Sequence, residues 1–347
     1  MRMRVKFPCL TLIAILLLTG GWACHQRIEK KRAPIPLLVW PKPPEVPRIR
    51  FLKAVAGPDD MDIRAGLFGR FFDYITGKQE SGMVSPYGVE TDTSGRLYVV
   101  DTFLKRIHLF DPAAGKYSTI PGEESALLSP IDLAVDPGSG DVFVSDSQAG
   151  TVSRYGKGKP ATLGKGLLKR PTGLALNAKS GELLVVDTLS HAVFRFGLKD
   201  LQLKGRFGRS GTGDGSFNHP TNIFVDRAGS IYVTDSLNFR IQVFTPEGSF
   251  QAAFGGIGDN PGRFARPRGV AVDSEGNIYV VDGLFDNVQI FDREFRLLMA
   301  FGGPGSDFGK FWLPTGIFID SEDTIYVSDQ YNKRVQVFQY LKADEAL

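Results

Sequence analysis

Short apolar runs separated by turn residues fill the chain from about residue 85 to residue 338. One stretch reads Pro-Thr-Asn-Ile-Phe-Val-Asp at 220–226, then Gly229, Ile-Tyr-Val-Thr-Asp at 231–235 and Arg-Ile-Gln-Val-Phe at 240–244. Runs of β-branched and aromatic residues bounded by turn residues predict strands. A further run at 249–254 follows, so this stretch predicts four consecutive strands.

The same unit recurs six times. Each copy opens on a proline, its second strand closes on an aspartate, and successive prolines are 41 to 49 residues apart. Four antiparallel strands per unit at this period are typical of a propeller blade, so the sequence predicts an all-β, six-bladed β-propeller. The prolines are Pro86, Pro130, Pro171, Pro220, Pro267 and Pro314, and the aspartates are Asp101, Asp146, Asp187, Asp235, Asp282 and Asp329.

The recurring residues Pro-x-Gly-Val/Ile, Ile/Leu-Tyr-Val-x-Asp and Arg-Ile/Val-Gln-Val-Phe resemble the NHL repeat over about residues 85–338. The resemblance is weakest in the second and third copies, where Gly150 and Ala192 replace a residue near the Asn-x-Arg motif. It implies a propeller of NHL repeats, of the bacterial exported or lipoprotein type. Animal relatives bind RNA or act beside ubiquitin-ligase modules, but this chain has no zinc-binding Cys/His module. We therefore do not transfer those activities.

The two ends of the repeat region predict how the ring closes. The last copy stops after its third strand, and residues 49–57 resemble the fourth-strand segments at 249–255 and 295–302. We expect this N-terminal strand to complete the sixth blade, since it would cover two otherwise open sheet edges. The propeller then spans 49–341, and 342–347 form a tail.

The N-terminus has the layout of a secretory signal. Three basic residues among the first six precede an apolar run at 10–18, which is too short to span a bilayer comfortably. Cys24 follows Ala23, so residues 1–23 resemble a bacterial lipoprotein signal with lipid attachment at Cys24. Gly21 stands where such signals usually carry leucine, which leaves ordinary cleavage near Ala23 open.

Composition after this signal excludes several function classes. The signal carries three basic residues and no acidic one, so the remaining chain holds 38 of each. This balance gives no electrostatic argument for nucleic-acid binding. The two cysteines are Cys9 and Cys24, which leaves no internal disulfide. Residues 24–48 are rich in proline and predict an extended tether, with a disordered tail as the alternative.

An insertion at 59–83 separates the closing strand from the first copy. Its apolar residues have the spacing of one helix face. We expect that face either to pack on the first blade or to dock a partner protein through Phe68, Phe71, Phe72 and Ile75.

The repeated polar residues favour architecture over chemistry. An aspartate at one position of every copy is typical of a turn in which the carboxylate accepts backbone N–H groups. The glycine-rich segments share one frame and predict turns with positive φ rather than a phosphate loop. Propeller lactonases hold an axial calcium with unlike residues from unlike blades, and these copies look too similar to offer such a set. His25 lies in the tail, and His108, His191 and His219 occupy non-equivalent positions in three different copies. We therefore expect no catalytic residue, no metal and no cofactor.

A binding surface remains as the candidate site. The loops before the first strand and after the second strand of each blade share one face, and aromatic residues with arginine are typical of binding hot spots. The loop at 283–287 departs most from the repeat. The candidate face comprises Arg170, His219, Arg266, Phe239, Arg240, Phe285, Tyr331 and Arg334.

These observations predict a non-catalytic protein-binding or scaffold propeller of the bacterial cell envelope, tethered to the membrane. We expect an outer-membrane lipoprotein with a protein partner and no nucleic-acid partner. Two alternatives stay open: a propeller lyase or lactonase with an axial metal, and binding of carbohydrate or cell wall through the aromatic face.

Overall fold

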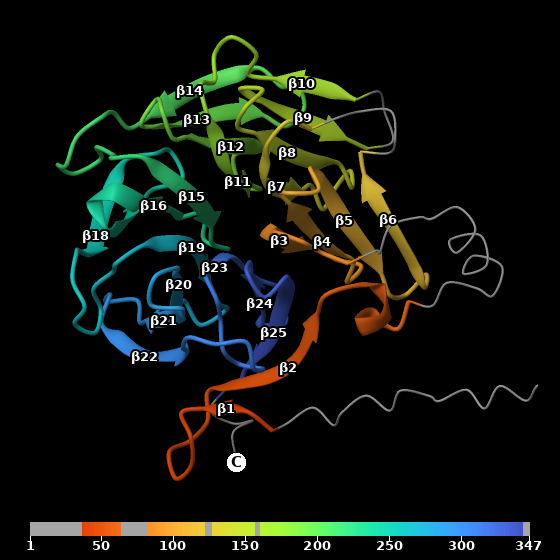
Figure 1. Cartoon of the computed structure of the whole chain (residues 1–347). Coiled ribbons are helices and arrows are strands. Elements are labelled where there is room, and N and C mark those ends of the chain that lie inside the picture. Colours follow the sequence, from red (N-terminus) through yellow and green to blue (C-terminus); the bar gives the residue numbers. More distant parts are fainter. Residues whose placement is uncertain (1–36, 64–81, 122–126, 157–159, 343–347) are drawn as a thin grey trace, which may run out of the picture. The chain divides into compact units, whose positions relative to one another are not determined.

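The computed structural model describes residues 37–63, 82–121, 127–156 and 160–342. In this part of the chain, six antiparallel sheets surround a central axis, and the first strand of each sheet lies nearest the axis (Figure 1). The predicted six-bladed β-propeller is confirmed. No helix in the described ranges is long and apolar enough to cross a membrane.

Each blade is an antiparallel meander from the axis outward. The inner strands are β3 (Pro86–Thr91), β7 (Pro130–Val135), β11 (Pro171–Asn177), β15 (Pro220–Val225), β19 (Pro267–Val272) and β23 (Pro314–Ile319). The second strands are β4 (Leu97–Asp101), β8 (Val142–Asp146), β12 (Glu182–Asp187), β16 (Ile231–Asp235), β20 (Ile278–Asp282) and β24 (Thr324–Asp329).

The outer half of each blade follows the same order. The third strands are β5 (Arg106–Asp111), β9 (Thr151–Tyr155), β13 (Ala192–Gly197), β17 (Arg240–Phe244), β21 (Asn287–Phe291) and β25 (Arg334–Tyr340). The fourth strands are β6 (Lys116–Ile120), β10 (Ala161–Leu163), β14 (Leu203–Phe207), β18 (Phe250–Gly255), β22 (Leu297–Gly302) and, from the N-terminal side, β2 (Ile49–Val55). Two short 3-10 turns, η1 (Pro58–Met61) and η2 (Ser236–Asn238), complete the elements.

The N-terminal strand closes the ring as expected. β2 pairs antiparallel with β25, with Phe51 opposite Phe338 and Val55 opposite Val335 (Figure 1). Phe51 is buried, and its ring centroid lies 5.6 Å from that of Phe338 in an edge-to-face contact. The sixth blade is therefore assembled from both ends of the described chain.

Part of the segment expected to be a tether belongs to the sixth blade. β1 (Val39–Trp40) pairs with β2 and adds a fifth strand to that sheet. The cause is the Trp40 side chain, whose ring centroid lies 5.9 Å from those of both Phe301 and Phe338. Burial of a large aromatic side chain holds this short piece against the blade.

Other N-terminal predictions fall where the structure gives no description. The signal at 1–23, Cys24 and the proposed helix residues Phe68, Phe71, Phe72 and Ile75 all lie outside the described residues. Of the insertion at 59–83, the structure describes η1 with its buried Met61, and Ile63 and Met83, which pack with the first and sixth blades.

The repeated aspartates have the architectural role expected of them. Asp101 is fully buried, and its carboxylate accepts hydrogen bonds from the amides of Val84 at 2.6 Å and Leu104 at 2.8 Å. It thereby joins the loop before its blade to the turn after β4. The carboxylates of all six aspartates accept backbone N–H groups of the loop before the inner strand, so the prediction is confirmed.

The glycine-rich segments between blades are turns, as predicted. Gly255 has a φ of 99°, and its Cα lies against the ring of Phe264, which is fully buried. A side chain at this position would be strained in both backbone and packing.

Candidate functional site

The loops expected to share one face do so. In every blade the proline that opens the inner strand pairs with the aspartate that closes the second strand, as Pro86 does with Asp101. The loops before the inner strands and after the second strands therefore lie on one side of the ring. We call this side the loop face.

A ring of exposed apolar side chains marks the loop face. Two positions after the repeated aspartate, five of the six copies carry a large apolar residue, and the second copy carries Gln148. The exposed fractions of these side chains run from 46% to 70%. Exposed apolar surface of this kind is typical of interaction sites. The ring consists of Phe103, Leu189, Leu237, Leu284 and Tyr331, and we call it the apolar ring.

Sequence reasoning missed the residue that extends this ring. Trp312 is 55% exposed, and its ring centroid lies 5.5 Å from that of Tyr331. Tyr331 was among the expected residues of the face, whereas Trp312 follows a buried phenylalanine of the glycine-rich frame. The available signal in the sequence was a tryptophan placed in the loop that leads into the last copy.

Two of the expected binding arginines already have structural partners. The Arg240 guanidinium donates to the Asp235 carboxylate at 2.8 Å and to the Ser216 carbonyl at 3.0 Å. Arg334 does the same with Asp329, and its residue is buried. The hydrogen bonds of Arg240 and Arg334 therefore stabilise the loops of the loop face.

The remaining expected residues differ in exposure. Arg170, Arg266 and Tyr331 are exposed, whereas Phe239 and Phe285 are half-buried. His219 is half-buried too, and its imidazole ring lies 4.7 Å from that of His191, measured between centroids.

The waist of the central channel is formed by the third residue of each inner strand. Four copies have glycine there, and the close approach requires it. A Cβ at Gly173 would lie 2.7 Å from the Cα of Asn222 in the next blade. The other two copies carry Asp132 and Asn222, which fill the waist.

Axial side chains link neighbouring blades. The Leu174 amide donates to Asp132 at 3.1 Å, and the Val270 amide donates to Asn222 at 3.1 Å. The Val135 amide donates to Glu90 at 3.2 Å. The expectation that the copies are too similar to place unlike residues on the axis is therefore wrong. The signal was present in the sequence, because Asp132 and Asn222 replace the glycine of the Pro-x-Gly motif.

The two axial carboxylates are perturbed. Burial raises the pKa of Asp132 to about 7, although the amide hydrogen bonds oppose this shift. Burial also raises the pKa of Glu90 well above its usual value, and the charge of Asp132 adds to the increase. Asp132 can therefore hold a proton near neutral pH, and the pKa of Glu90 is shifted in the same direction.

A cavity of about 750 Å³ opens on the side of the ring opposite the loop face. Glu90 and Asp132 line it, together with the apolar side chains of Phe224 and Phe318. It extends outward between the fourth and fifth blades as far as Phe295. Cavities of this size with a few perturbed polar groups are typical of small-ligand sites. Within the described ranges, no group of three or more His, Cys, Asp or Glu side chains is placed to hold a metal.

Comparison with known families agrees with this geometry. A family described as "6-bladed beta-propeller" matches residues 227–294, and the NHL repeat matches residues 311–338. The chain is a six-bladed β-propeller with NHL repeats. A comparison with curated protein sequences finds no match.

Solved structures share the fold of this NHL-repeat propeller at low sequence identity. An auxiliary nutrient binding protein from Bacteroides thetaiotaomicron has a TM-score of 0.60 at 16% identity, covering 75% of this chain and 70% of that one. A structural genomics protein of unknown function from the same organism has a TM-score of 0.59 at 18% identity, covering 75% and 70%. Virginiamycin B lyase from Staphylococcus aureus has a TM-score of 0.56 at 15% identity, covering 74% and 96%. At such identities the likeness concerns the fold alone.

Proposed function

We propose that this NHL-repeat propeller is a non-catalytic protein-binding scaffold of the cell envelope, and that its partner docks on the loop face. The observation that carries the proposal is the apolar ring. Five blades expose a large apolar side chain at one equivalent position. Because exposing such surface to water is unfavourable, a recurrent exposed ring favours a covered state.

The surroundings of the ring support the same role. Trp312 beside Tyr331 supplies the kind of rigid aromatic anchor that dominates protein interfaces. The buried aspartate networks of Asp235 and Asp329 fix the loops, so little conformational entropy is lost when a partner binds. One of the structures that share this fold is an auxiliary nutrient binding protein.

The test uses the full chain expressed with its own N-terminus. A photo-crosslinking amino acid is introduced at Leu237 or Leu284 on the ring and, as a matched control, at Leu203 or Leu298. The control leucines are exposed to a similar extent but lie on outer strands. We expect one discrete crosslinked partner from the ring positions and none from the control positions.

Substitution then asks whether the ring provides the affinity. The double variant Leu237→Ser, Leu284→Ser should lose the partner, whereas Leu203→Ser, Leu298→Ser should keep it. Equal crosslinking from both pairs of positions, or full retention of the partner by the ring variant, would contradict the proposal.

Envelope tethering is the second part of the proposal, and it rests on the signal-like segment and Cys24. Fractionation of cells that express the wild type and Cys24→Ala separates the two cleavage alternatives. A lipidated protein sediments with membranes, and the variant is released as soluble protein. Identical fractionation of both would eliminate lipid attachment at Cys24.

A second candidate function, lyase or lactonase chemistry at the axis, is favoured by Glu90 and Asp132 at the floor of the cavity. Proton-holding carboxyl groups in a cavity are suited to general acid or base catalysis. Elemental analysis of the purified protein tests the metal-dependent form of this candidate. Absence of a stoichiometric metal, with no gain of activity on adding calcium or magnesium, would eliminate it.

A further inference from the structure

Two arginines of the fifth blade lie near each other without an acidic partner. Arg240 and Arg334 pair with buried aspartates, but in the part of the chain that the structure describes neither Arg266 nor Arg268 forms an ion pair. Burial and the charge of Arg268 lower the pKa of Arg266, and the other groups acting on it are the phenols of Tyr87 and Tyr331. A pair of like charges held by the fold without a counter-charge is an incomplete arrangement.

Arg268 is held in place by the first blade. Its Nη1 donates to the Tyr87 hydroxyl at 2.8 Å, and its guanidinium carbon lies 5.8 Å from the centre of the Tyr87 ring. Its Nε is buried and has no hydrogen-bond partner. A buried N–H of a charged group without a partner is costly, so one hydrogen-bonding group of Arg268 is left unsatisfied in this arrangement.

The departure of the loop at 283–287 from the repeat makes room for Arg268. Other blades carry threonine, serine or glutamine directly after the repeated aspartate, and in this blade the residue is Gly283. A Cβ at Gly283 would lie 3.2 Å from the carbonyl oxygen of Pro314 in the next blade, 3.3 Å from Cγ of Arg268 and 3.4 Å from its Nε, so the glycine leaves room for both neighbours. The fifth copy, which departs most from the repeat, thus has its glycine at the position that contacts Arg268.

The axial mouth of the loop face gathers further donors. Arg268 and Thr221 line a narrow space of about 10 Å³ directly above the waist, together with Tyr87. The hydroxyl of Thr221 is also buried without a partner. Asp132 lines the same space from below, and because its pKa is about 7 it carries a proton below neutral pH.

We propose that the axial mouth of the loop face binds an oxyanion, a carboxylate or phosphate group, between Arg266 and Arg268. The Tyr87 hydroxyl, which accepts a hydrogen bond from Arg268 and also acts on the pKa of Arg266, completes the donor set. Paired guanidinium groups bind such anions through parallel, charge-assisted hydrogen bonds. If the proposed function holds, the anion is an acidic group of the partner, surrounded by the apolar ring.

The experiment measures binding to the full purified chain by isothermal titration calorimetry. Inorganic phosphate and acetate are the two probes, since one carries the chemistry of a phosphorylated group and the other that of a peptide carboxylate. We expect saturable binding of at least one probe. A stronger response to acetate favours a peptide carboxylate, and a stronger response to phosphate favours a phosphorylated group.

Variants locate the site. Arg266→Gln should weaken binding at least tenfold, and Gly283→Ser should weaken it by crowding Arg268. Lys333→Gln, an exposed cation of the loop face outside this site, should bind as the wild type does. Arg266 is exposed, so its variant should fold normally, and far-ultraviolet circular dichroism checks this. A second variant, Arg268→Gln, removes the other guanidinium group and should also weaken binding, with its folding checked in the same way.

Three results would overturn the inference: no binding of either probe up to about 10 mM, unchanged binding in Arg266→Gln, or equal weakening in Lys333→Gln. Partner crosslinking in Arg266→Gln separates this inference from the proposed function. If Arg266→Gln loses anion binding but crosslinks the partner as before, the anion site is supported, and an acidic group of the partner does not occupy it. Crosslinking through the ring without any anion binding leaves the scaffold role standing alone.

Discussion

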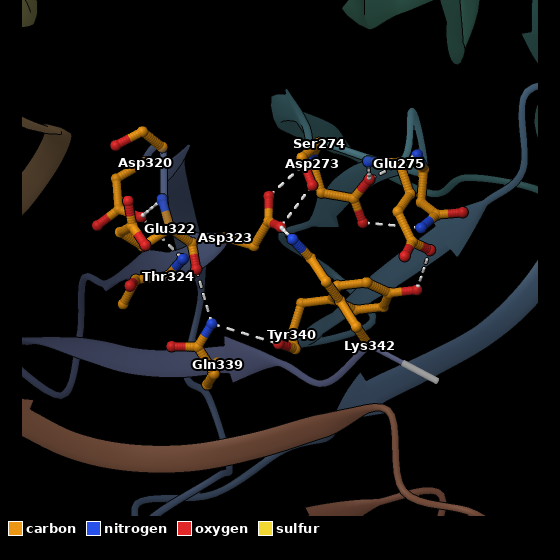
Figure 2. Close-up of polar contacts among 12 residues, drawn as sticks. Asp273, Ser274, Glu275, Asp320, Glu322, Asp323, Thr324, Gln339, Tyr340 and Lys342 are labelled. Atoms are coloured by element: carbon orange, nitrogen blue, oxygen red, sulfur yellow. Dashed lines mark hydrogen bonds and ion pairs between the residues drawn. The ribbon is translucent and has the colours of Figure 1, made fainter. Parts of the chain in front are cut away.

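The carboxylate of Asp323 accepts hydrogen bonds from both the amide and the hydroxyl of Ser274, at 2.8 Å and 2.6 Å (Figure 2). This contact joins the turn after β23 to the turn after β19. Asp323 has a φ of 59° and stands where several other copies have glycine. The Lys342 ammonium lies 3.2 Å from the same carboxylate, and the Tyr340 hydroxyl donates to Glu275 beside it (Figure 2).

This contact predicts that the aspartate is worth more than the glycine it replaces. Asp323→Gly relieves a left-handed backbone conformation, a gain of about 1 kcal/mol. It also removes two hydrogen bonds to a buried carboxylate, each worth about 1.5–3 kcal/mol. The free energy of unfolding in urea should therefore fall by about 2–5 kcal/mol. Glu322→Gln, an exposed neighbour in the same turn, serves as control, and greater stability of Asp323→Gly would refute the argument.

Ring closure depends on the buried face of β2. Phe51→Ala should lower the free energy of unfolding by about 3–5 kcal/mol, because a buried aromatic side chain leaves a cavity between Phe338 and Phe308. Arg50→Ala on the exposed face of the same strand should change it little. Chemical denaturation of both variants provides the measurement. Similar losses in the two would mean that strand pairing, rather than the side chain, holds the closure.

The waist of the channel should reject even one methyl group. A Cβ at Gly316 would overlap the carbonyl oxygen of Tyr87 in the first blade, and backbone cannot move aside cheaply. Gly316→Ala is expected to reduce the melting temperature strongly or to prevent folding. Gly205→Ala in β14, with no atom near the added Cβ, should be neutral or slightly stabilising. A normal melting temperature for Gly316→Ala would show that the inner strands can separate.

The axial acids predict a dependence of stability on pH. The folded-state pKa of Asp132, about 7, exceeds the ordinary value near 4. The folded protein therefore binds more protons than the unfolded chain between these values, and stability falls as the pH rises from about 4 to about 7. Asp132→Asn should nearly match the wild type at pH 4 and be more stable by roughly 1–4 kcal/mol at pH 8.

Urea denaturation at both pH values measures this effect, with the exposed Asp214→Asn as control. An unchanged difference between wild type and Asp132→Asn across the two pH values would mean that Asp132 is not ionising in this range.

At acidic pH the dependence of stability on pH has the opposite sign. Burial opposes ionisation of Asp101, but hydrogen bonds from His108 and backbone amides outweigh it and lower its pKa to about 2. Its contribution is lost as the pH falls below about 4.

The repeat explains what the sequence could and could not reveal. The proline and the aspartate that appear as Pro86 and Asp101 in the first copy recur in all six copies at similar spacing. The blades, the loop face and the closing strand could therefore be predicted from this periodicity. The axial positions could not, because each inner strand shifts register between its proline and its third or fourth residue, as between Pro86 and Val89. Simple alternation along a strand cannot show which side chain then points to the axis.

Interactions between blades were equally hidden. Arg268 contacts Tyr87, which is 181 residues earlier in the chain, and only the closed ring brings them together. Trp40 likewise packs against Phe301 and Phe338, which are far from it in sequence, so part of the expected tether belongs to the sixth blade. Differences between copies, such as Gly283 and Asp132, were visible in the sequence, but the residues that they contact became visible only in three dimensions.

The pairing of β2 with β25 also sets an order of events. β2 is synthesised before every blade strand, and its partner is synthesised after all of them. The sixth blade therefore cannot form until the residues of β25 have been synthesised, whatever the first five blades have done by then. A product that ends before Arg334 would carry five nascent blades and two unsatisfied strand edges, which is the state most exposed to aggregation and proteolysis.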